Sequence, residues 1–241
     1  QKRRHSFILM ADMGDLREGV YFENRDELLE LAKACASEYT ALIGIGTNLT
    51  CCCGVLPSES NMKGLVSLAR FIEGELGITL EIVSGGNSSA VSLLQSGRMP
   101  KGVNNLRMGE SLLLGRDTGT GEPIAGMFQD AFTLTAQLIE VKTKPSVPVG
   151  SVGVNAFGEK PVFTDKGLMK RGIAALGRQD GSMAGLTPLD GRVKLLAQSS
   201  DHLVLDLTRT AYEVGDRLGF GVTYGGLLGL YTSPYVDKKY M

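Results

Sequence analysis

Short apolar runs of strand length alternate with stretches of helical periodicity over the first half of the chain. Each run is rich in aliphatic residues and ends in glycine or small polar residues, which is typical of a buried strand that enters a turn. The expected strands lie at residues 7–11, 41–45 and 80–83 and in a run that ends at Arg107. The expected helices lie at residues 24–35 and 60–76, with a short one after Asn87. This order predicts a parallel sheet with right-handed crossovers.

The pattern changes after residue 120. Residues 132–142 alternate between apolar and polar side chains, and turn signals separate the apolar runs that follow. Those runs lie at residues 172–176, 193–197, 203–207 and 218–222. Alternation with short spacings is typical of antiparallel strands. We therefore expect two domains, an α/β domain at residues 1–120 and an all-β domain at residues 121–241.

Two of the expected strands run into turns that are rich in glycine and small polar residues. The first turn contains Gly85 and Gly86, and the second contains Gly109 before a helical stretch. Such strand–turn–helix units direct several backbone N–H groups at one point, and the helix dipole adds partial positive charge. We interpret the pair as an anion site for a phosphate. The alternative is that these are ordinary loop glycines.

The net charge of the chain limits the kinds of partner that it is expected to bind. Among 241 residues, 25 are basic and 26 acidic, for a formal net charge of −1. This balance offers no field for nucleic acid or an anionic membrane. No apolar run is long enough to cross a bilayer. We expect a soluble protein that binds neither nucleic acid nor a membrane.

The numbers and positions of the cysteines and histidines limit the expected cellular compartment and the kinds of metal site. Three of the four cysteines are adjacent, at residues 51–53, which is not the spaced framework of a secreted domain. A reducing cytoplasm is therefore the expected compartment. The only histidines are His5 and His202, and no cysteine pair has zinc-site spacing. We expect no metal site.

Several motifs together resemble the alanine racemase family of pyridoxal-phosphate (PLP) enzymes, fold type III. They are Asp-Met-Gly-Asp-Leu-Arg-Glu-Gly at 12–19, Gly-Thr-Asn at 46–48, Gly-Asn-Ser at 86–88, Leu-Arg-Met-Gly at 106–109 and Ser-Ser-Asp-His at 199–202. The first and last of these, with Gly-Arg-Gln-Asp at 177–180 and Thr-Ser-Pro-Tyr at 232–235, most resemble the ornithine racemases in that family. The resemblance implies the C-terminal half of a TIM-like (β/α)8 barrel followed by an antiparallel β domain.

The resemblance also implies a cofactor phosphate site at the two glycine-rich turns. It places Asn87 and Ser88 there, together with the backbone N–H groups of Gly109 and Glu110. This agrees with the anion site inferred from the turns themselves. Tyr235 is the expected phosphate-binding tyrosine, with Tyr224 and Tyr231 as competing choices.

Three further residues would surround the cofactor ring. Arg107 would face the pyridine nitrogen, where an arginine can donate a hydrogen bond but cannot give up its proton. Arg17 would lie near the phenolic oxygen or the substrate carboxylate, and its alternative is an ion pair with Asp12 or Asp15. Asn48 stands where related enzymes often carry a histidine.

The family binds its cofactor as a Schiff base on a lysine at the end of the first barrel strand. No lysine of this sequence has that context. In addition, four strands cannot close an eight-stranded barrel. We therefore expect the chain to be part of a longer polypeptide, or to be completed by a separate one, that supplies the N-terminal barrel segment and the lysine.

Racemisation needs one proton-transferring group on each face of the planar carbanion. The family's lysine would be one of them. The family's opposite-face tyrosine is missing from residues 177–181. The remaining choices are His202, whose imidazole suits proton transfer near neutral pH, and the carboxylates Asp180 and Asp201. Either carboxylate could instead bind the distal ammonium of a basic substrate.

These inferences predict a PLP-dependent racemase of ornithine or another basic amino acid, working as a homodimer with shared active sites. One alternative is a PLP lyase of the same fold, of the D-threonine aldolase or dehydratase type. The shortage of histidine argues against it, because those enzymes hold a divalent metal. The other alternative is a non-catalytic PLP-binding protein. The β domain argues against that class, which lacks one.

Overall fold

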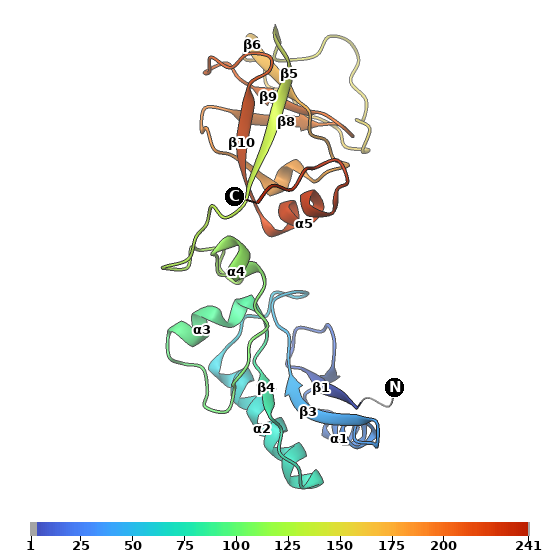
Figure 1. The fold of residues 1–241 in the computed structure, drawn as a ribbon. Helices are drawn as coiled ribbons and strands as arrows, with labels where there is room; N and C mark the ends of the chain where they lie inside the picture. Colours follow the sequence, from blue (N-terminus) through green and yellow to red (C-terminus); the bar gives the residue numbers. More distant parts are fainter. Residues whose placement is uncertain (1–3, 241) are drawn as a thin grey trace. The chain divides into compact units, whose positions relative to one another are not determined.

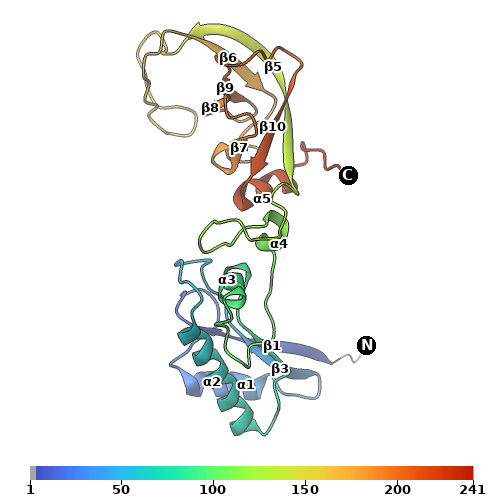
Figure 2. The same ribbon diagram turned by 90° about the vertical axis from the view of Figure 1, so that its left-hand side faces the viewer.

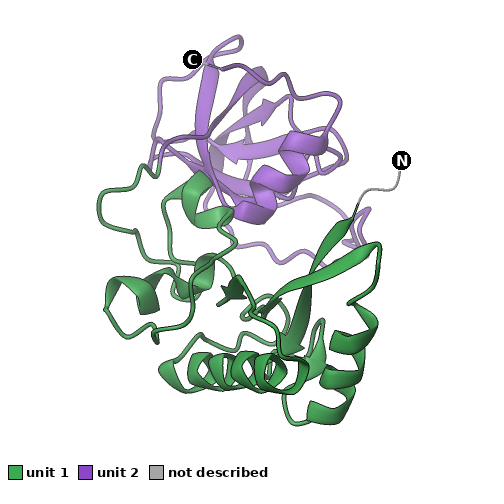
Figure 3. Cartoon of the chain, turned by 60° about the horizontal axis from the view of Figure 1, so that its bottom comes forward, with its two compact units in different colours: residues 1–129 green, residues 130–241 purple. Residues whose placement is uncertain are grey.

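The computed structural model describes residues 4–240. The chain divides between Gln129 and Asp130 into two compact units, which are coloured separately in Figure 3. Unit 1 contains the α/β part and unit 2 the β-rich part, and each is described by itself.

Unit 1 is built on a parallel sheet, as the sequence predicts. Its strand order is β2-β1-β3-β4, and every neighbouring pair runs parallel. The strands are β1 (His5–Asp12), β2 (Val20–Tyr21), β3 (Thr40–Gly46) and β4 (Ile82–Ser84). Because parallel strands end at the same edge, the loops after β1, β3 and β4 emerge together.

Two long helices cover this sheet on one face, where they lie side by side (Figure 2). They are α1 (Arg25–Ala34) and α2 (Glu59–Leu76). The start of α2 has a reciprocal capping box between Ser58 and Asn61, and its end is set by Gly77, whose φ is 62°. Leu65 and Ile72 on α2 are fully buried in the core against the sheet.

The expected strand ending at Arg107 does not form, so this part of the prediction is wrong. Only an isolated parallel bridge joins Asn105 to Ser84. The backbone N–H groups of Asn104 and Asn105 both donate to the Val83 carbonyl, and the Asn104 side chain adds two more bonds to β4. Its Oδ1 accepts from Val83 N–H at 2.8 Å, and its Nδ2 donates to the Glu81 carbonyl at 2.8 Å. These bonds occupy the edge of β4.

Three short helical segments complete unit 1 around the turns that follow β4. They are the 3-10 turn η1 (Ser88–Ala90), α3 (Val91–Gln95) and α4 (Glu110–Leu114). The helix expected after Asn87 is thus present, with the Asn87 side chain capping η1.

Unit 2 is a six-stranded antiparallel sheet in the order β7-β10-β5-β6-β9-β8. Figure 1 labels five of these strands, and Figure 2 also labels β7. The strands are β5 (Thr133–Pro145), β6 (Leu168–Ala174), β7 (Leu186–Pro188), β8 (Lys194–Gln198), β9 (Leu203–Asp206) and β10 (Arg217–Val222). Fully buried residues on the sheet, among them Leu138, Leu205 and Phe220, form its core.

Unit 2 is not entirely β, which corrects the expectation of an all-β domain. It also contains η2 (Met183–Gly185) and helix α5 (Tyr224–Thr232). Three glycines give α5 a low helix propensity, which hides it from the sequence pattern. One of them allows close packing, because a Cβ on Gly226 would lie 2.4 Å from the Gly185 carbonyl oxygen.

Over residues 4–240, no helix combines the length and apolar character that a bilayer span requires.

Candidate functional site

The residues that the sequence places around a cofactor phosphate gather in unit 1, where the loops after β3 and β4 emerge. Thr47 and Asn48 directly follow β3, and Gly85 to Ser88 follow β4. The segment from Asn105 to Ser111 joins them through its backbone, since Gly85 N–H donates to the Asn105 carbonyl and Arg107 N–H to the Gly86 carbonyl. The two glycine-rich turns predicted from the sequence are therefore held next to each other by backbone hydrogen bonds.

Ser88 links the first turn to the start of α4. Its hydroxyl oxygen accepts the N–H groups of Gly109 and Ser111, both at 3.1 Å. A serine hydroxyl has two acceptor lone pairs and one donor proton. Both acceptor positions of Ser88 are filled, so its proton remains free for an outside acceptor. Nearby, the buried hydroxyl of Ser111 has no hydrogen-bond partner among residues 4–240, and Glu110 N–H, as the first of α4, has no intrahelical acceptor.

Asn87 fixes the position of this turn. Its Nδ2 donates to Asn48 Oδ1 at 2.7 Å and to the Leu49 carbonyl at 2.9 Å, and lies 3.1 Å from Cys51 Sγ. Its Oδ1 accepts from the N–H and the hydroxyl of Ser89. Asn48 is thus one of the anchors of Asn87, with 8% of its surface exposed.

Arg107 connects the carboxyl end of β3 to the carboxyl end of β4. One terminal nitrogen donates to Ser84 Oγ at 2.6 Å, and the other donates to the Thr47 carbonyl at 2.8 Å. The hydroxyl of Thr47 is buried and has no hydrogen-bond partner in the part of the chain that the structure describes. These bonds hold the guanidinium at the strand ends and leave further N–H donors on it unassigned.

The loop after β1 is organised by two buried aspartates. Asp12 accepts the N–H groups of Gly14 and Leu16. Asp15 is fully buried and accepts from Cys52 N–H at 2.9 Å, Cys53 N–H at 3.2 Å and Val55 N–H at 3.0 Å. Burial alone would raise the pKa of Asp15, but these backbone donors outweigh it and lower the pKa. Asp15 is therefore the clamp that holds residues 50–55 against this loop.

Arg17 is exposed on the same loop and pairs with its neighbour. Its Nε lies 3.0 Å from Glu18 Oε2, so the ion pair that the sequence suggested with Asp12 or Asp15 is not formed. Since both groups are about half exposed, the pair contributes little to stability and leaves Arg17 free to bind an anion.

Glu110, at the first turn of α4, has a raised pKa because burial disfavours its charged form. Its carboxyl lies in the same segment as the N–H groups of Gly109 and Ser111. Glu110 has no cationic partner within 4.0 Å among residues 4–240, and it is the acidic residue in the first turn of α4.

The residues expected to transfer protons lie in unit 2. His202 Nδ1 is 3.2 Å from Asp201 Oδ1, and both side chains are about half exposed. The carboxylate can therefore orient the imidazole with its other nitrogen free. Asp180, in contrast, is buried, and it accepts from Ser233 Oγ at 2.8 Å and from Gly177 N–H at 3.0 Å. Because Ser233 directly follows α5, these bonds connect the end of α5 to the turn at residues 177–180. The two carboxylate oxygens of Asp180 are both occupied.

The tyrosines of the C-terminal segment are mostly exposed. Tyr235 has 74% of its surface exposed, and its backbone N–H donates to Ser233 Oγ. The hydroxyl of Tyr231 is 3.0 Å from that of Tyr240, so it already has a partner. Tyr224, at the start of α5, is 46% exposed.

Sequence reasoning missed the part played by Asp15 and by the anchors Ser84 and Thr47. The signal for Asp15 was weak, because its partners lie about forty residues further along the chain. Ser84 and Thr47 end apolar runs, which is the position where polar side chains of parallel sheets collect.

Residues 1–117 match the family described as alanine racemase, N-terminal domain. With the relatives below, this match shows that the chain belongs to the alanine racemase family, as its motifs suggest. The chain is 46% identical over 237 residues to the ornithine racemase of Acetoanaerobium sticklandii, covering 98% of this chain and 67% of that protein. It is 44% identical over 240 residues to the lysine racemase of Thermotoga maritima, covering 99% of this chain and 66% of that protein. The chain thus spans about two thirds of the length of these relatives.

Solved structures agree on the fold. The biosynthetic alanine racemase of Pseudomonas aeruginosa superposes with a TM-score of 0.64 at 18% identity, over 100% of this chain and 68% of that one. The D-threonine aldolase of Filomicrobium marinum superposes with a TM-score of 0.62 at 15% identity, over 93% of this chain and 56% of that one. At these identities the likeness concerns the fold alone.

Proposed function

We propose that this chain is part of a PLP-dependent racemase that interconverts the L- and D-enantiomers of ornithine or a similar basic amino acid. One observation carries the cofactor assignment: Ser88 accepts two N–H groups and keeps its own proton for an anion. The substrate class rests on the two relatives, which are named for ornithine and lysine.

The residues of unit 1 fit a cofactor phosphate. The Ser88 proton, the unpaired Ser111 hydroxyl and the N–H of Glu110 are donors in one short region. A phosphate has several acceptor oxygens and no need of a donor partner, so it complements this set. The buried Thr47 hydroxyl also has no hydrogen-bond partner among residues 4–240, and the carbonyl of the same residue accepts from Arg107.

PLP, when bound, supplies an electron sink that makes the Cα proton of an attached amino acid removable. Arg107 would donate a hydrogen bond to the ring nitrogen without transferring its proton. That restrains electron withdrawal, which favours return of the proton to Cα over its transfer elsewhere. The bonds to Ser84 and Thr47 keep the guanidinium in one orientation for this purpose.

His202 is the proposed proton-transferring group of unit 2, and Asp201 is its positioning residue. The contact of 3.2 Å to Nδ1 leaves Nε2 to take or give the proton at Cα. The buried, doubly bonded Asp180 fits a structural part better than proton transfer. Asp201 could also attract the distal ammonium of a basic substrate, since it is exposed.

Arg17 and Tyr235 complete the proposed set. Arg17 offers a guanidinium fork that suits the substrate carboxylate or the phenolic oxygen of the cofactor. The exposed hydroxyl of Tyr235 would reach the phosphate. We also propose a homodimer with shared sites in the cytoplasm. The four cysteines of the chain are free thiols, which suits a reducing compartment.

Substitution of Ser88 tests the cofactor site directly. In the full-length protein, Ser88→Ala should weaken PLP binding by about 10-fold or more, the value of one hydrogen bond to a charged group. Binding of pyridoxal, which has no phosphate, should stay unchanged. Ser96→Ala is the matched control, because that hydroxyl donates to the Leu93 carbonyl and accepts from Arg98, so its proton is already used within the chain. Equal losses for PLP and pyridoxal would remove Ser88 from the phosphate site.

The substrate class is tested by chiral chromatography of the PLP-loaded protein with L-ornithine, L-lysine and L-alanine. We expect D-ornithine or D-lysine to form faster than D-alanine. Aldehyde or ammonia release would favour the lyase alternative, and no turnover of any substrate would favour a binding protein.

A further inference from the structure

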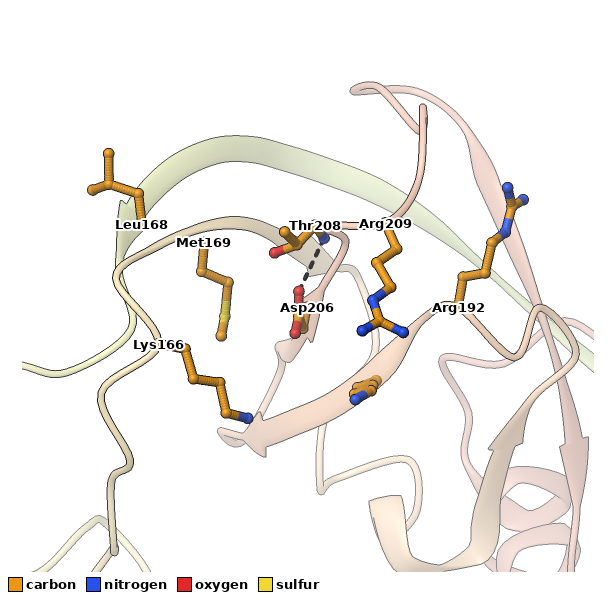
Figure 4. Close-up of a pocket in the computed structure, with 8 residues that line it drawn as sticks. Lys166, Leu168, Met169, Arg192, Asp206, Thr208 and Arg209 are labelled. Carbon is orange, nitrogen blue, oxygen red and sulfur yellow. Dashed lines mark hydrogen bonds between the residues drawn. The ribbon is translucent and has the colours of Figure 1, made fainter.

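A cavity of about 300 Å³ in unit 2 is lined by more positive than negative side chains (Figure 4). Lys166 precedes β6, Lys194 begins β8 and Arg209 follows β9. Arg192 also borders the cavity, and Asp206 is the one carboxylate among its lining residues. The site is thus formed by segments that the antiparallel sheet brings together.

Three of these cations are available to a ligand. In Figure 4 the side chains of Lys166 and Arg209 approach from either side of Asp206, whereas Arg192 points away. Arg192 is already paired, with two nitrogens at 2.9 and 2.8 Å from the carboxylate of Asp190. Within residues 4–240, no carboxylate lies within 4.0 Å of the charged nitrogens of Lys166, Lys194 or Arg209.

Asp206 lies among these cations without forming an ion pair with any of them. It faces Lys194 across the β8–β9 pair and accepts the N–H of Thr208 at 2.9 Å. Burial alone would raise the pKa of Asp206, but the hydrogen bonds from Thr208 and the charges of Lys194 and Lys166 lower it. One negative charge among three unpaired cations leaves about two positive charges uncompensated.

We propose that this cavity binds a small dianionic oxyanion of the phosphate class, either inorganic phosphate or a phosphate monoester. The two uncompensated charges match a dianion, and flexible ammonium groups with an arginine fork are the side chains that bind phosphate. Buried Met169 also lines the cavity and provides an apolar wall for the organic part of a monoester. The volume suits a ligand of this size.

Calorimetric titration of the full-length, PLP-loaded protein tests the site, with inorganic phosphate and phenyl phosphate as probes at constant ionic strength. Lys194→Ala and Arg209→Ala should each weaken binding by about 10-fold, the value of one charge-assisted hydrogen bond. Asp206→Asn should tighten binding, because it removes the repelling charge and keeps the oxygen that Thr208 needs. Preference for phenyl phosphate would identify a monoester, and equal binding would identify free phosphate.

Lys142→Ala is the matched control, since this exposed lysine on β5 removes the same charge from unit 2 but does not line the cavity. Lys166→Ala provides a second test if one variant does not fold. Binding of neither probe would overturn the proposal. So would an equal effect of Lys142→Ala and Lys194→Ala, or weaker binding in Asp206→Asn.

Discussion

Asp15 gives the sharpest test of how unit 1 is organised. The isosteric change Asp15→Asn keeps one oxygen for the N–H groups of Cys53 and Val55 but directs an amide NH2 at Cys52 N–H. It removes one bond to a charged acceptor, worth about 1.5–3 kcal/mol, and leaves a donor facing a donor. Water can reach the exposed Cys52 and so limits the cost of the unpaired N–H group. We therefore expect the free energy of local unfolding to fall by about 2–3 kcal/mol.

This loss should concentrate in residues 50–55. Thr50 has a φ of 75° there, which is unfavourable for a β-branched residue and depends on its surroundings. Hydrogen exchange measured by mass spectrometry in the full-length protein should be about 30- to 150-fold faster for these amides, by the conversion of 1.36 kcal/mol per tenfold. Asp130→Asn, an exposed change outside unit 1, is the control. Unchanged exchange rates at residues 50–55 would show that the Asp15 carboxylate does not hold this loop in place.

The pH dependence of this effect has a defined sign. The pKa of Asp15 is lowered by folding, so its contribution to stability is present above the unfolded value of about 3.9 and is lost as pH falls through the folded pKa. The difference in unfolding free energy between the wild type and Asp15→Asn should be constant from about pH 7 to pH 5 and shrink below about pH 4. A difference that grows on acidification would contradict the assignment.

Three further predictions concern other parts of the chain. Gly177→Ala should lower the melting temperature by several degrees, because its Cβ would lie 2.0 Å from the Ser200 carbonyl oxygen, whereas Gly191→Ala meets nothing within 4 Å and should not. Glu110→Gln should raise the stability of the cofactor-free protein near neutral pH, since a raised pKa means that the charged form opposes folding; calorimetry at pH 7 that detects no gain would refute this. His202→Ala should impair Cα proton exchange from one enantiomer more than from the other, and equal retention of both rates would exclude His202 from proton transfer.

The parallel sheet was predictable because its strands are aliphatic runs that stop at polar residues. β1, β3 and β4 all lie within two residues of their expected positions. The absence of a strand near Arg107 was not predictable in the same way, because backbone pairing stops at one bridge and the Asn104 side chain makes further bonds to β4, and nothing in the periodicity of this segment differs from a strand. Helix α5 was hidden by glycines that tertiary packing requires.

The phosphate turn was predictable in composition but not in its connections. Glycines and small residues indicate where N–H groups cluster, so Ser88 and Gly109 could be named in advance. That both N–H donors use the Ser88 oxygen depends on distances between segments about twenty residues apart. Asp15 shows the same limit, because its three donors are contributed by a loop that is remote in sequence.

We propose that this chain belongs to a racemase that removes and returns the Cα proton of a basic amino acid. The most direct test is Cα deuterium exchange of L-ornithine in D2O, followed by proton NMR and chiral chromatography with the full-length protein and PLP. We expect loss of the Cα proton signal together with formation of D-ornithine that carries deuterium at Cα. No exchange with either ornithine enantiomer, or with lysine, in PLP-loaded protein would contradict it.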